Sequence, residues 1–278
     1  MDNENKSYFK KMLMSELPRI TVIMGIYNCA DTLIEALESL ESQTYKRFKV
    51  VLCDDGSKDN TLEVALKWAE THPNYVVIQN ERNIKLAATL NHCLKYADTE
   101  YVARMDGDDI SLPTRFEKEI AFLDLHPEFA FVSTPMAHFD EHGIWRKGKA
   151  IEYPQNCDFR DCAPFCHAPC MVRKSAYDLV NGYTTGEKVE RAEDFYLWYK
   201  MYRSGLKGYN IQEILYMMRD DKNAIARRRV KDRLRGVKMH WEILKGLNVK
   251  YPYLIILTSL SKILVPPFLI PTLRKLKK

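Results

Sequence analysis

Short apolar runs alternate with segments of helical spacing between residues 20 and 104. The apolar runs, rich in β-branched side chains, lie at 20–26, 48–53, 75–79 and 100–104. Between them, apolar side chains recur every three or four positions, as on one face of a helix: Leu33, Leu37 and Leu40, then Leu62, Ala65, Leu66 and Ala69, then Leu86, Leu90, Cys93, Leu94 and Ala97. This alternation predicts an α/β fold with a largely parallel central sheet and helices on both of its faces.

Polar residues follow each of the four apolar runs. The clusters are Tyr27-Asn28, Asp54-Asp55-Gly56-Ser57, Asn80 to Asn83, and Asp106 to Asp109. Taken singly, each cluster could be a turn or a helix cap, with Asp59 or Asn60 capping the helix after the second run. Parallel strands, however, end at a common sheet edge, where open α/β sheets bind their ligands. We therefore expect these clusters to form one binding site.

The residue types at this edge are those that a nucleotide requires. An aromatic ring can stack on a base, a carboxylate can accept the base N–H, and hard oxygen ligands can hold a divalent ion on a diphosphate. The chain contains neither G-x-G-x-x-G nor G-x-x-x-x-G-K-[ST]. Phosphate is therefore expected to be held by a metal ion and not by a glycine-rich loop.

Charge is distributed unevenly along the 278 residues, 46% of which are hydrophobic. Residues 222–278 carry 15 Lys/Arg and 2 Asp/Glu, a net charge of +13, so the +5 of the whole chain leaves −8 on residues 1–221. The chain is long enough for one large domain or two closely joined halves. We expect an acidic folded body that ends in a basic helical tail.

The tail is apolar as well as basic. Lys262 and Pro266-Pro267 divide it into pieces shorter than the roughly 20 residues that a membrane-spanning helix requires. Two helical faces are predicted: an apolar one with Leu254, Ile255, Leu257, Ile263 and Leu264, and a polar one with Thr258, Ser259, Ser261 and Lys262. With the basic residues of 274–278, this pattern favours a helix lying on an anionic membrane surface. A helix packed on the protein or on a neighbouring subunit is the alternative.

Residues 1–18 are polar and mixed in charge, so we expect no secretory signal and a cytoplasmic protein. The seven scattered cysteines are then expected to be reduced thiols. A zinc site is conceivable from Cys157, Cys162, Cys166, Cys170 and His167. Zinc is disfavoured, because no C-x-x-C pair occurs and two prolines interrupt the segment.

Several stretches resemble family-2 glycosyltransferases of the A-type (GT-A) fold, such as those of bacterial capsule, O-antigen and exopolysaccharide synthesis. The stretch ITVIMGIYNCADTLIEALESLESQTYKRFKVVLCDDGSKDNT resembles the opening of that family. The MDGDD within NERNIKLAATLNHCLKYADTEYVARMDGDDISLPTRFEKE resembles the family's D-x-D motif. Its acceptor-side motifs are similar to HAPCMVRKSAYDLVNGY and RAEDFYLWYKMYRSG. The resemblance covers roughly residues 19–220. It implies transfer of a sugar from a nucleoside diphosphate with inversion at the anomeric carbon.

The resemblance assigns donor-binding roles to residues after the first three strands. Tyr27 matches the residue that stacks on the base, expected to be uracil. Asp55 matches the acceptor for the base N–H, with Asp54 as the less certain neighbour. Lys85 matches a position near the donor phosphates that is often basic or small.

The resemblance also assigns the acidic cluster after the fourth strand. Asp106 would contact the ribose, the sugar or the metal, while Asp108 would coordinate Mn²⁺ or Mg²⁺ on the two phosphates. Asp109 would either support the metal or cap the next helix. A diphosphate gathers negative charge as the glycosidic bond breaks, which a divalent ion stabilises as a Lewis acid.

An inverting reaction also requires a base for the acceptor hydroxyl. The resemblance assigns that role to Asp194, with Glu193 as the second candidate. Because a helix dipole keeps such a carboxylate ionised, the spacing suits an N-cap as well as a base. His167, in an acceptor-side motif, would contact acceptor or diphosphate, or would be structural.

We divide the chain into an extension (1–18), a nucleotide-sugar-binding half (19–110), an acceptor-binding half of the same domain (111–221) and the basic tail (222–278). The Q-x-x-R-W motif and the spanning helices of processive members do not occur, which predicts one sugar per encounter. The stretch RDDKNAIARRRVKDRLR is either a lid or a solvated helix with Arg228, Lys231 and Arg235 on one side.

Two other classes of function are weighed against an enzyme. Nucleic-acid binding is disfavoured, because few aromatics accompany the basic tail and the acidic sheet edge would repel phosphates. A non-catalytic scaffold that binds a nucleotide sugar is the second, and the presence of Asp108 and Asp194 argues against it. The expected partners are a UDP-sugar donor, a saccharide or lipid-linked saccharide acceptor, and the inner face of an anionic membrane, contacted peripherally.

Overall fold

The computed structural model describes residues 17–219 and 230–263, with side chains omitted at 230–235 and 259–263. Its first half alternates strands and helices as the pattern predicts. The elements are β1 (Ile20–Ile26), α2 (Ala30–Glu41), β2 (Phe48–Asp54), α3 (Thr61–Thr71), β3 (Tyr75–Gln79), α4 (Leu86–Leu94) and β4 (Tyr101–Arg104). The predicted interpretation of residues 228–235 as a lid or a solvated helix face lies outside the described side chains.

The central sheet runs through both halves of the chain. The second half contributes β5 (Ile110–Ser111), α5 (Arg115–Leu125), β6 (Phe131–Ser133), β7 (Ala137–Asp140), β8 (Gly143–Lys147), the 3₁₀ helix η1 (Asn156–Arg160), β9 (Met171–Arg173), α6 (Lys174–Leu179), α7 (Glu193–Arg203), β10 (Gly208–Asn210) and β11 (Tyr216–Arg219). The strand order is β10-β6-β9-β4-β1-β2-β3, and β9 runs antiparallel to both of its neighbours. The remaining pairs are parallel, which confirms the predicted α/β class.

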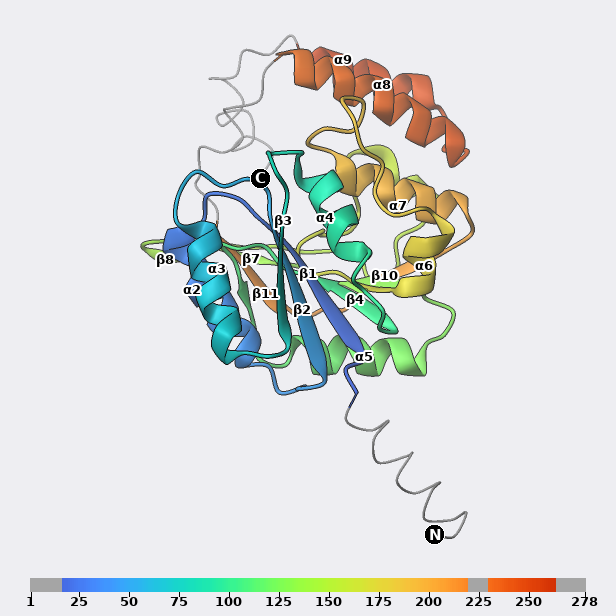
Figure 1. Ribbon diagram of the computed structural model, residues 1–278. Helices are drawn as coiled ribbons and strands as arrows, with labels where there is room; N and C mark the ends of the chain where they lie inside the picture. Colours follow the sequence, from blue (N-terminus) through green and yellow to red (C-terminus); the bar gives the residue numbers. More distant parts are fainter. Residues whose placement is uncertain (1–16, 220–229, 264–278) are drawn as a thin grey trace.

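Successive side chains of the buried strands enter two separate cores, because neighbouring residues of a strand point to opposite faces. Ile23 and Val102 pack with α4, α6 and α7, whereas Val22 and Val50 pack with α2, α3 and α5. Figure 1 shows α2 and α3 on one side of the sheet and α4, α6 and α7 on the other. Burial on both faces explains why these strands read as continuous apolar runs.

The strands β5, β7, β8 and β11 form a second, smaller sheet. Its order is β5-β11-β7-β8, and β8 is an exposed edge strand. Three of its strands have two to four residues. Short strands of this kind carry too little periodicity to be predicted, and the sequence pattern did not indicate this sheet.

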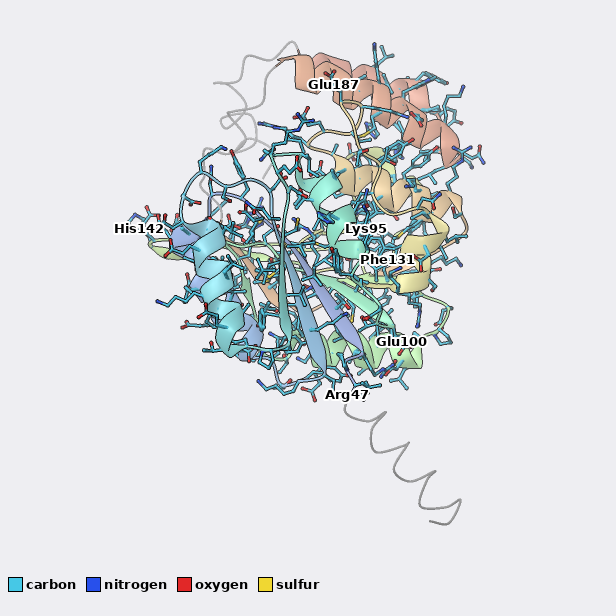
Figure 2. The ribbon with its side chains drawn as sticks, viewed as in Figure 1. Arg47, Lys95, Glu100, Phe131, His142 and Glu187 are labelled. Atoms are coloured by element: carbon cyan, nitrogen blue, oxygen red, sulfur yellow. The ribbon has the colours of Figure 1, made fainter. Side chains whose placement is uncertain are left out.

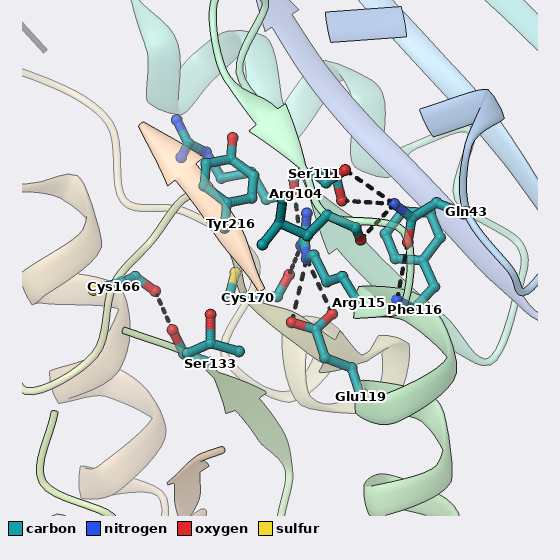
Figure 3. A network of polar contacts seen from close by, with 12 residues as sticks. Gln43, Arg104, Ser111, Arg115, Phe116, Glu119, Ser133, Cys166, Cys170 and Tyr216 are labelled. Carbon is teal, nitrogen blue, oxygen red and sulfur yellow. Dashed lines mark hydrogen bonds and ion pairs between the residues drawn. The ribbon is translucent and has the colours of Figure 1, made fainter. Parts of the chain in front are cut away.

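A buried polar network fastens the start of α5 to the strands around it (Figure 3). The Arg115 guanidinium pairs with Glu119 at 3.2 Å and donates to the carbonyl oxygens of Arg104 and Cys170. The Gln43 amide donates to the backbone carbonyl of Leu112 at 2.9 Å and accepts from the Phe116 N–H at 3.1 Å. Since Arg104 ends β4 and Cys170 precedes β9, this network positions the loop that contains Asp106 to Asp109.

Two further helices, α8 (Val230–Gly246) and α9 (Pro252–Ile263), lie side by side next to α7 (Figure 1). Ile243, Leu244 and Ile255 are buried in the core that contains α7. Leu254 and Leu257 are 52% and 60% exposed. The predicted apolar face of α9 is therefore divided, since Ile255 packs inward and the two leucines face solvent. No helix in the described part of the chain is long and apolar enough to cross a membrane.

Candidate functional site

Two adjoining pockets lie at the carboxyl edge of the main sheet and share Gly25, Ile26 and Tyr27. The larger, of about 590 Å³, is bordered by Asp55, Lys85 and Glu193, and the smaller, of about 360 Å³, by Asp106 and Asp108. Figure 2 places Glu187, which borders the larger pocket, at the end of the molecule opposite Arg47 and Glu100. The four polar clusters identified in the sequence thus lie directly after parallel strands, at the carboxyl edge of the main sheet.

Tyr27 lies where the two pockets meet. Its side chain is 44% exposed, and it follows directly after β1. The next residue, Asn28, has a φ of 49° and accepts the Lys58 N–H at 2.8 Å through its side chain. A large, partly exposed aromatic ring between two pockets is available for stacking on a flat ligand.

The two acids after β2 differ in their surroundings. Asp54 is fully buried, borders neither pocket, and accepts the N–H groups of Gly56 and Ser57 at 3.1 Å. Its placement favours a role in the turn over contact with a ligand. Asp55 borders the larger pocket and accepts the N–H groups of Ile84 and Lys85 at 2.8 and 3.0 Å. A carboxylate has about four lone-pair sites, so Asp55 keeps capacity for a ligand N–H.

Lys85 adopts a backbone conformation that is close to glycine-only. Its φ and ψ are 76° and 156°, a region in which a β-carbon is strained by about 1–3 kcal/mol. The hydrogen bonds to Asp55 hold the segment in this shape. The exposed side chain of Lys85 borders the larger pocket. Strain of this kind clusters at ligand sites, which directs attention to this lysine.

The acidic cluster borders the smaller pocket. Burial, and then the charge of Asp106, raise the pKa of Asp108 to about 6. Burial, and then the charges of Asp106 and Asp108, raise the pKa of Asp109 to about 8. Three carboxyl groups are thus held close enough to repel one another, and a cation placed among them would favour their ionised forms.

Asp109 has a structural partner that the sequence did not indicate. Its carboxylate accepts the Arg219 N–H at 2.8 Å, joining the acidic loop to the end of β11. The helix-capping alternative for Asp109 is wrong, because the cap residue of α5 is Thr114 and no side chain caps that helix. Arg219 also donates to the Asp108 carbonyl at 2.9 Å and borders the smaller pocket.

Arg104 is the main site residue that the sequence analysis missed. It is 4% exposed at the end of β4, and its guanidinium donates to Asp106 at 2.5 Å. Its charge also acts on Asp108, Glu193 and His167. An arginine in an otherwise apolar strand is rarely buried without a partner, so its position beside the acidic cluster was a usable signal.

Glu193 and Asp194 occupy the first turn of α7 and lie in different surroundings. Glu193 borders the larger pocket, and burial raises its pKa above the ordinary value. Asp194 borders neither pocket and lies close enough to Cys166 for its charge to raise the pKa of that thiol. The N-cap alternative is wrong for both, because the cap residue is Ala192 and no side chain caps it.

His167 borders neither pocket. Its ring nitrogen Nε2 is 2.8 Å from the Tyr183 hydroxyl, which lies 3.0 Å from that of Tyr177. Burial, and then the Arg104 charge, hold the pKa of His167 well below its ordinary value. A neutral histidine bonded to a buried tyrosine fits the structural alternative for this residue.

The acidic pocket fits a divalent ion that is shared with a ligand. Asp106 and Asp108 offer the hard oxygen donors that Mg²⁺ and Mn²⁺ prefer. In the described ranges, which include Cys157 to Cys170, no group of three or more His, Cys, Asp or Glu side chains could hold a metal on its own. Mg²⁺ is commonly bound by one or two carboxylates plus substrate phosphates, so a diphosphate would have to complete the coordination.

Comparison with known proteins gives one family. The model described as "Glycosyl transferase family 2" matches residues 21–180. The putative glycosyltransferase EpsE of Bacillus subtilis is 44% identical over 216 residues, which cover 77% of this chain and 78% of that protein. The UDP-Glc:alpha-D-GlcNAc-diphosphoundecaprenol beta-1,3-glucosyltransferase WfaP of Escherichia coli is 25% identical over 239 residues, covering 85% and 90%.

Solved structures share the fold. The complex of TarS of S. aureus with UDP-GlcNAc superimposes with a TM-score of 0.69 at 19% identity, covering 87% of this chain and 71% of that one. The mannosyltransferase PcManGT of Pyrobaculum calidifontis, in complex with GDP-Man and Mn²⁺, gives a TM-score of 0.63 at 21% identity, covering 92% and 73%. These likenesses confirm the expected GT-A fold.

Proposed function

The chain belongs to glycosyl transferase family 2, and we propose that it transfers one sugar per encounter from a UDP-sugar to a lipid-linked saccharide in surface polysaccharide synthesis. The observation that carries the proposal is the shared wall of the two pockets. Tyr27 and Asp55 border the larger pocket. Asp106 and Asp108 border the smaller pocket, which Tyr27 also borders. A nucleoside and its diphosphate need a stacking ring, an N–H acceptor and hard oxygen ligands in that succession.

The proposed reaction is a direct displacement at the anomeric carbon. The acceptor hydroxyl oxygen forms a bond to the anomeric carbon while the bond between that carbon and the diphosphate oxygen breaks, which inverts the configuration at the carbon. The hydroxyl proton passes to the Asp194 carboxylate, and the electron pair of the broken bond leaves with the nucleoside diphosphate. Asp106 and Asp108 would hold a divalent ion, which supplies Lewis-acid stabilisation of the leaving group.

Relatives and the chain itself support the proposed acceptor class. WfaP is described as acting on a GlcNAc-diphosphoundecaprenol acceptor. The halves 19–110 and 111–221 are assigned to donor and acceptor, respectively, and the tail to the inner face of the membrane. A panel of nucleotide sugars with Mn²⁺ and a synthetic lipid-diphosphate saccharide tests the whole proposal. Release of nucleoside diphosphate and a new glycoside are expected with one UDP-sugar, and no product with any donor would refute it.

Replacing Lys85 with glycine is expected to stabilise the fold and weaken donor binding. Relief of the strain, less the extra flexibility of glycine in the unfolded chain, should raise the free energy of unfolding by roughly 1 kcal/mol. Loss of the ammonium group near the diphosphate should weaken donor affinity about tenfold. Denaturant unfolding and calorimetric titration with UDP-sugar measure the two effects.

Lys85→Met is the matched control, because it removes the charge and keeps the β-carbon. It should lose donor affinity as Lys85→Gly does, without the gain in stability. Unchanged donor affinity in both variants would show that Lys85 does not contact the donor.

The exposed leucines of α9 are proposed to contact an anionic membrane. Leu254 and Leu257 face solvent, and Tyr251 and Tyr253 are 61% and 55% exposed beside them. Each leucine contributes about 1.5–3 kcal/mol when buried in an apolar medium, so replacing both with glutamate should lower binding to anionic vesicles more than tenfold. Co-sedimentation with vesicles measures this loss.

The control for the membrane experiment is Leu125→Glu, at a 77% exposed position on α5. It should leave vesicle binding unchanged. A Leu254→Glu/Leu257→Glu protein that still sediments with vesicles, or that aggregates without them, would favour packing of this face on protein.

A further inference from the structure

The hairpin of β7 and β8 carries an aromatic and a cationic side chain that the donor pockets do not use. His138 pairs with Arg146 and Phe139 with Ile144, so Trp145 is the extra residue of a β-bulge. In a bulge, two residues oppose one on the partner strand and re-aim a side chain. The Trp145 ring lies 5.5 Å from the His138 ring, and the Arg146 guanidinium donates to that same ring. Trp145 and Arg146 therefore point to one face of the small sheet, the face that carries His138.

That face leads back to the acidic cluster. His138 pairs in parallel register with Met218, and side chains at paired positions point to the same face of a sheet. Tyr216 precedes Met218 by two residues on β11, so its side chain points to that face as well. The Tyr216 hydroxyl accepts the Asp106 N–H at 3.2 Å. Figure 3 shows Tyr216 beside Arg104, which bonds Asp106. The buried end of this face thus contacts the Asp106 backbone through Tyr216, and its exposed end carries Trp145 and Arg146.

The Cys166 segment lies next to the start of this hairpin, and the charge of Asp194 acts on its thiol. The Cys166 carbonyl accepts the Ser133 hydroxyl at 2.7 Å, which places it at the end of β6, three residues before β7 (Figure 3). Burial first raises the pKa of the Cys166 thiol, the Asp194 charge raises it further, and the Arg146 charge lowers it. The Ser133–Cys166 hydrogen bond thus joins the Cys166 segment to the strand that leads into the hairpin, and the charges of Asp194 and Arg146 both act on the Cys166 thiol.

We propose that this face is the acceptor subsite and that it binds a sugar attached to a phosphate group, with Trp145 stacked on the sugar ring and Arg146 paired with the phosphate. The inference rests on the proposed function and identifies the residues that would select its acceptor. An indole presents a large flat surface at little cost in rotamer freedom, and arginine binds phosphate oxygens through paired N–H donors. Trp145 is 36% exposed and Arg146 is exposed, so both are accessible from solvent.

The strand itself supplies matched controls. Lys147 pairs with Ala137 and points to the opposite face, so Lys147→Ala removes the same charge as Arg146→Ala without altering the subsite. Two acceptors with the same sugar separate the roles of the side chains. One carries a lipid diphosphate, and the other is a simple alkyl glycoside without phosphate.

The experiment measures acceptor binding by calorimetry, and acceptor KM by turnover, on the full chain. Arg146→Ala should weaken binding of the diphosphate acceptor about tenfold or more and leave the affinity for the alkyl glycoside unchanged. Trp145→Ala should weaken both acceptors by a similar factor, whereas donor affinity should stay unchanged in every variant. Equal acceptor affinities of wild type, Trp145→Ala and Arg146→Ala would overturn the proposal, as would an equal loss in Lys147→Ala and Arg146→Ala.

The measurements of binding and of turnover distinguish a failure of the subsite from a failure of the proposed function. A wild-type protein that binds the diphosphate acceptor through Arg146 and transfers no sugar refutes the proposed function and supports the subsite. A protein that transfers sugar with the same acceptor KM in all variants refutes the subsite alone.

Discussion

Replacing Asp194 with asparagine is expected to lower kcat at least about a hundredfold, because proton removal by a positioned carboxylate contributes about 10²- to 10⁴-fold. The amide keeps the shape of the side chain and loses its basicity. Asp194 lies in the first turn of α7 and is not its cap residue, so losing its charge should lower stability by only about 0.3–1 kcal/mol. Single-turnover and steady-state kinetics, donor titration and thermal unfolding together distinguish a loss of catalysis from a loss of donor binding or stability.

Glu193→Gln is the matched comparison for this prediction, because Glu193 lies in the same turn and faces the larger pocket. It is expected to lose less activity than Asp194→Asn. Turnover of Asp194→Asn at close to the wild-type rate would place the base elsewhere, and Glu193 would be the next residue to test.

Removal of divalent ions is expected to abolish sugar transfer, and Asp108→Asn is expected to lower kcat/KM by roughly a thousandfold. Several kcal/mol of stabilisation of the leaving diphosphate would be lost in either case. Because burial and Asp106 disfavour the ionised form of Asp108, its neutral replacement should not destabilise the fold. Nucleoside diphosphate release with EDTA, and its recovery on adding Mn²⁺ or Mg²⁺, measure the dependence.

Asp98→Asn serves as the control for the loss of one negative charge. The Asp98 side chain is 76% exposed, pairs with Lys49, and precedes β4 at the opposite end of the sheet from the pockets. It should retain full activity. Undiminished transfer in EDTA would remove the metal from the proposed reaction.

The parts of the fold that could be predicted from the sequence are those specified by local pattern. Strands β1, β2 and β4 are almost wholly buried on both faces, so their apolar runs are unmistakable, and parallel pairing brings Tyr27, Asp55 and Asp106 to one edge. The small sheet joins strands far apart in the chain, as in the pairing of Ser111 with Tyr216. Local periodicity contains no information on such pairs.

The conformation and partners of several site residues escaped prediction for a related reason. The glycine-like conformation of Lys85 depends on the Asp55 carboxylate, and the role of Asp109 depends on Arg219. Each partner lies on a distant segment of the chain, so neither constraint is visible in a window of neighbouring residues. Arg104 was visible as a charge in an apolar strand, but its meaning depended on the loop that follows.

The antiparallel strand β9 has a consequence for how such proteins diversify. It lies between β4 of the first half and β6 of the second, and one core joins Val102, Phe131 and Trp198 across the two halves. Cutting the chain between them would expose that core, so the halves cannot be exchanged between relatives as independent modules. The β7–β8 hairpin lies outside this core, with β8 exposed along its length and His142 at its tip (Figure 2). Given the acceptor subsite proposed for this hairpin, grafting a relative's hairpin is expected to transplant acceptor preference and leave the core shared by the two halves intact.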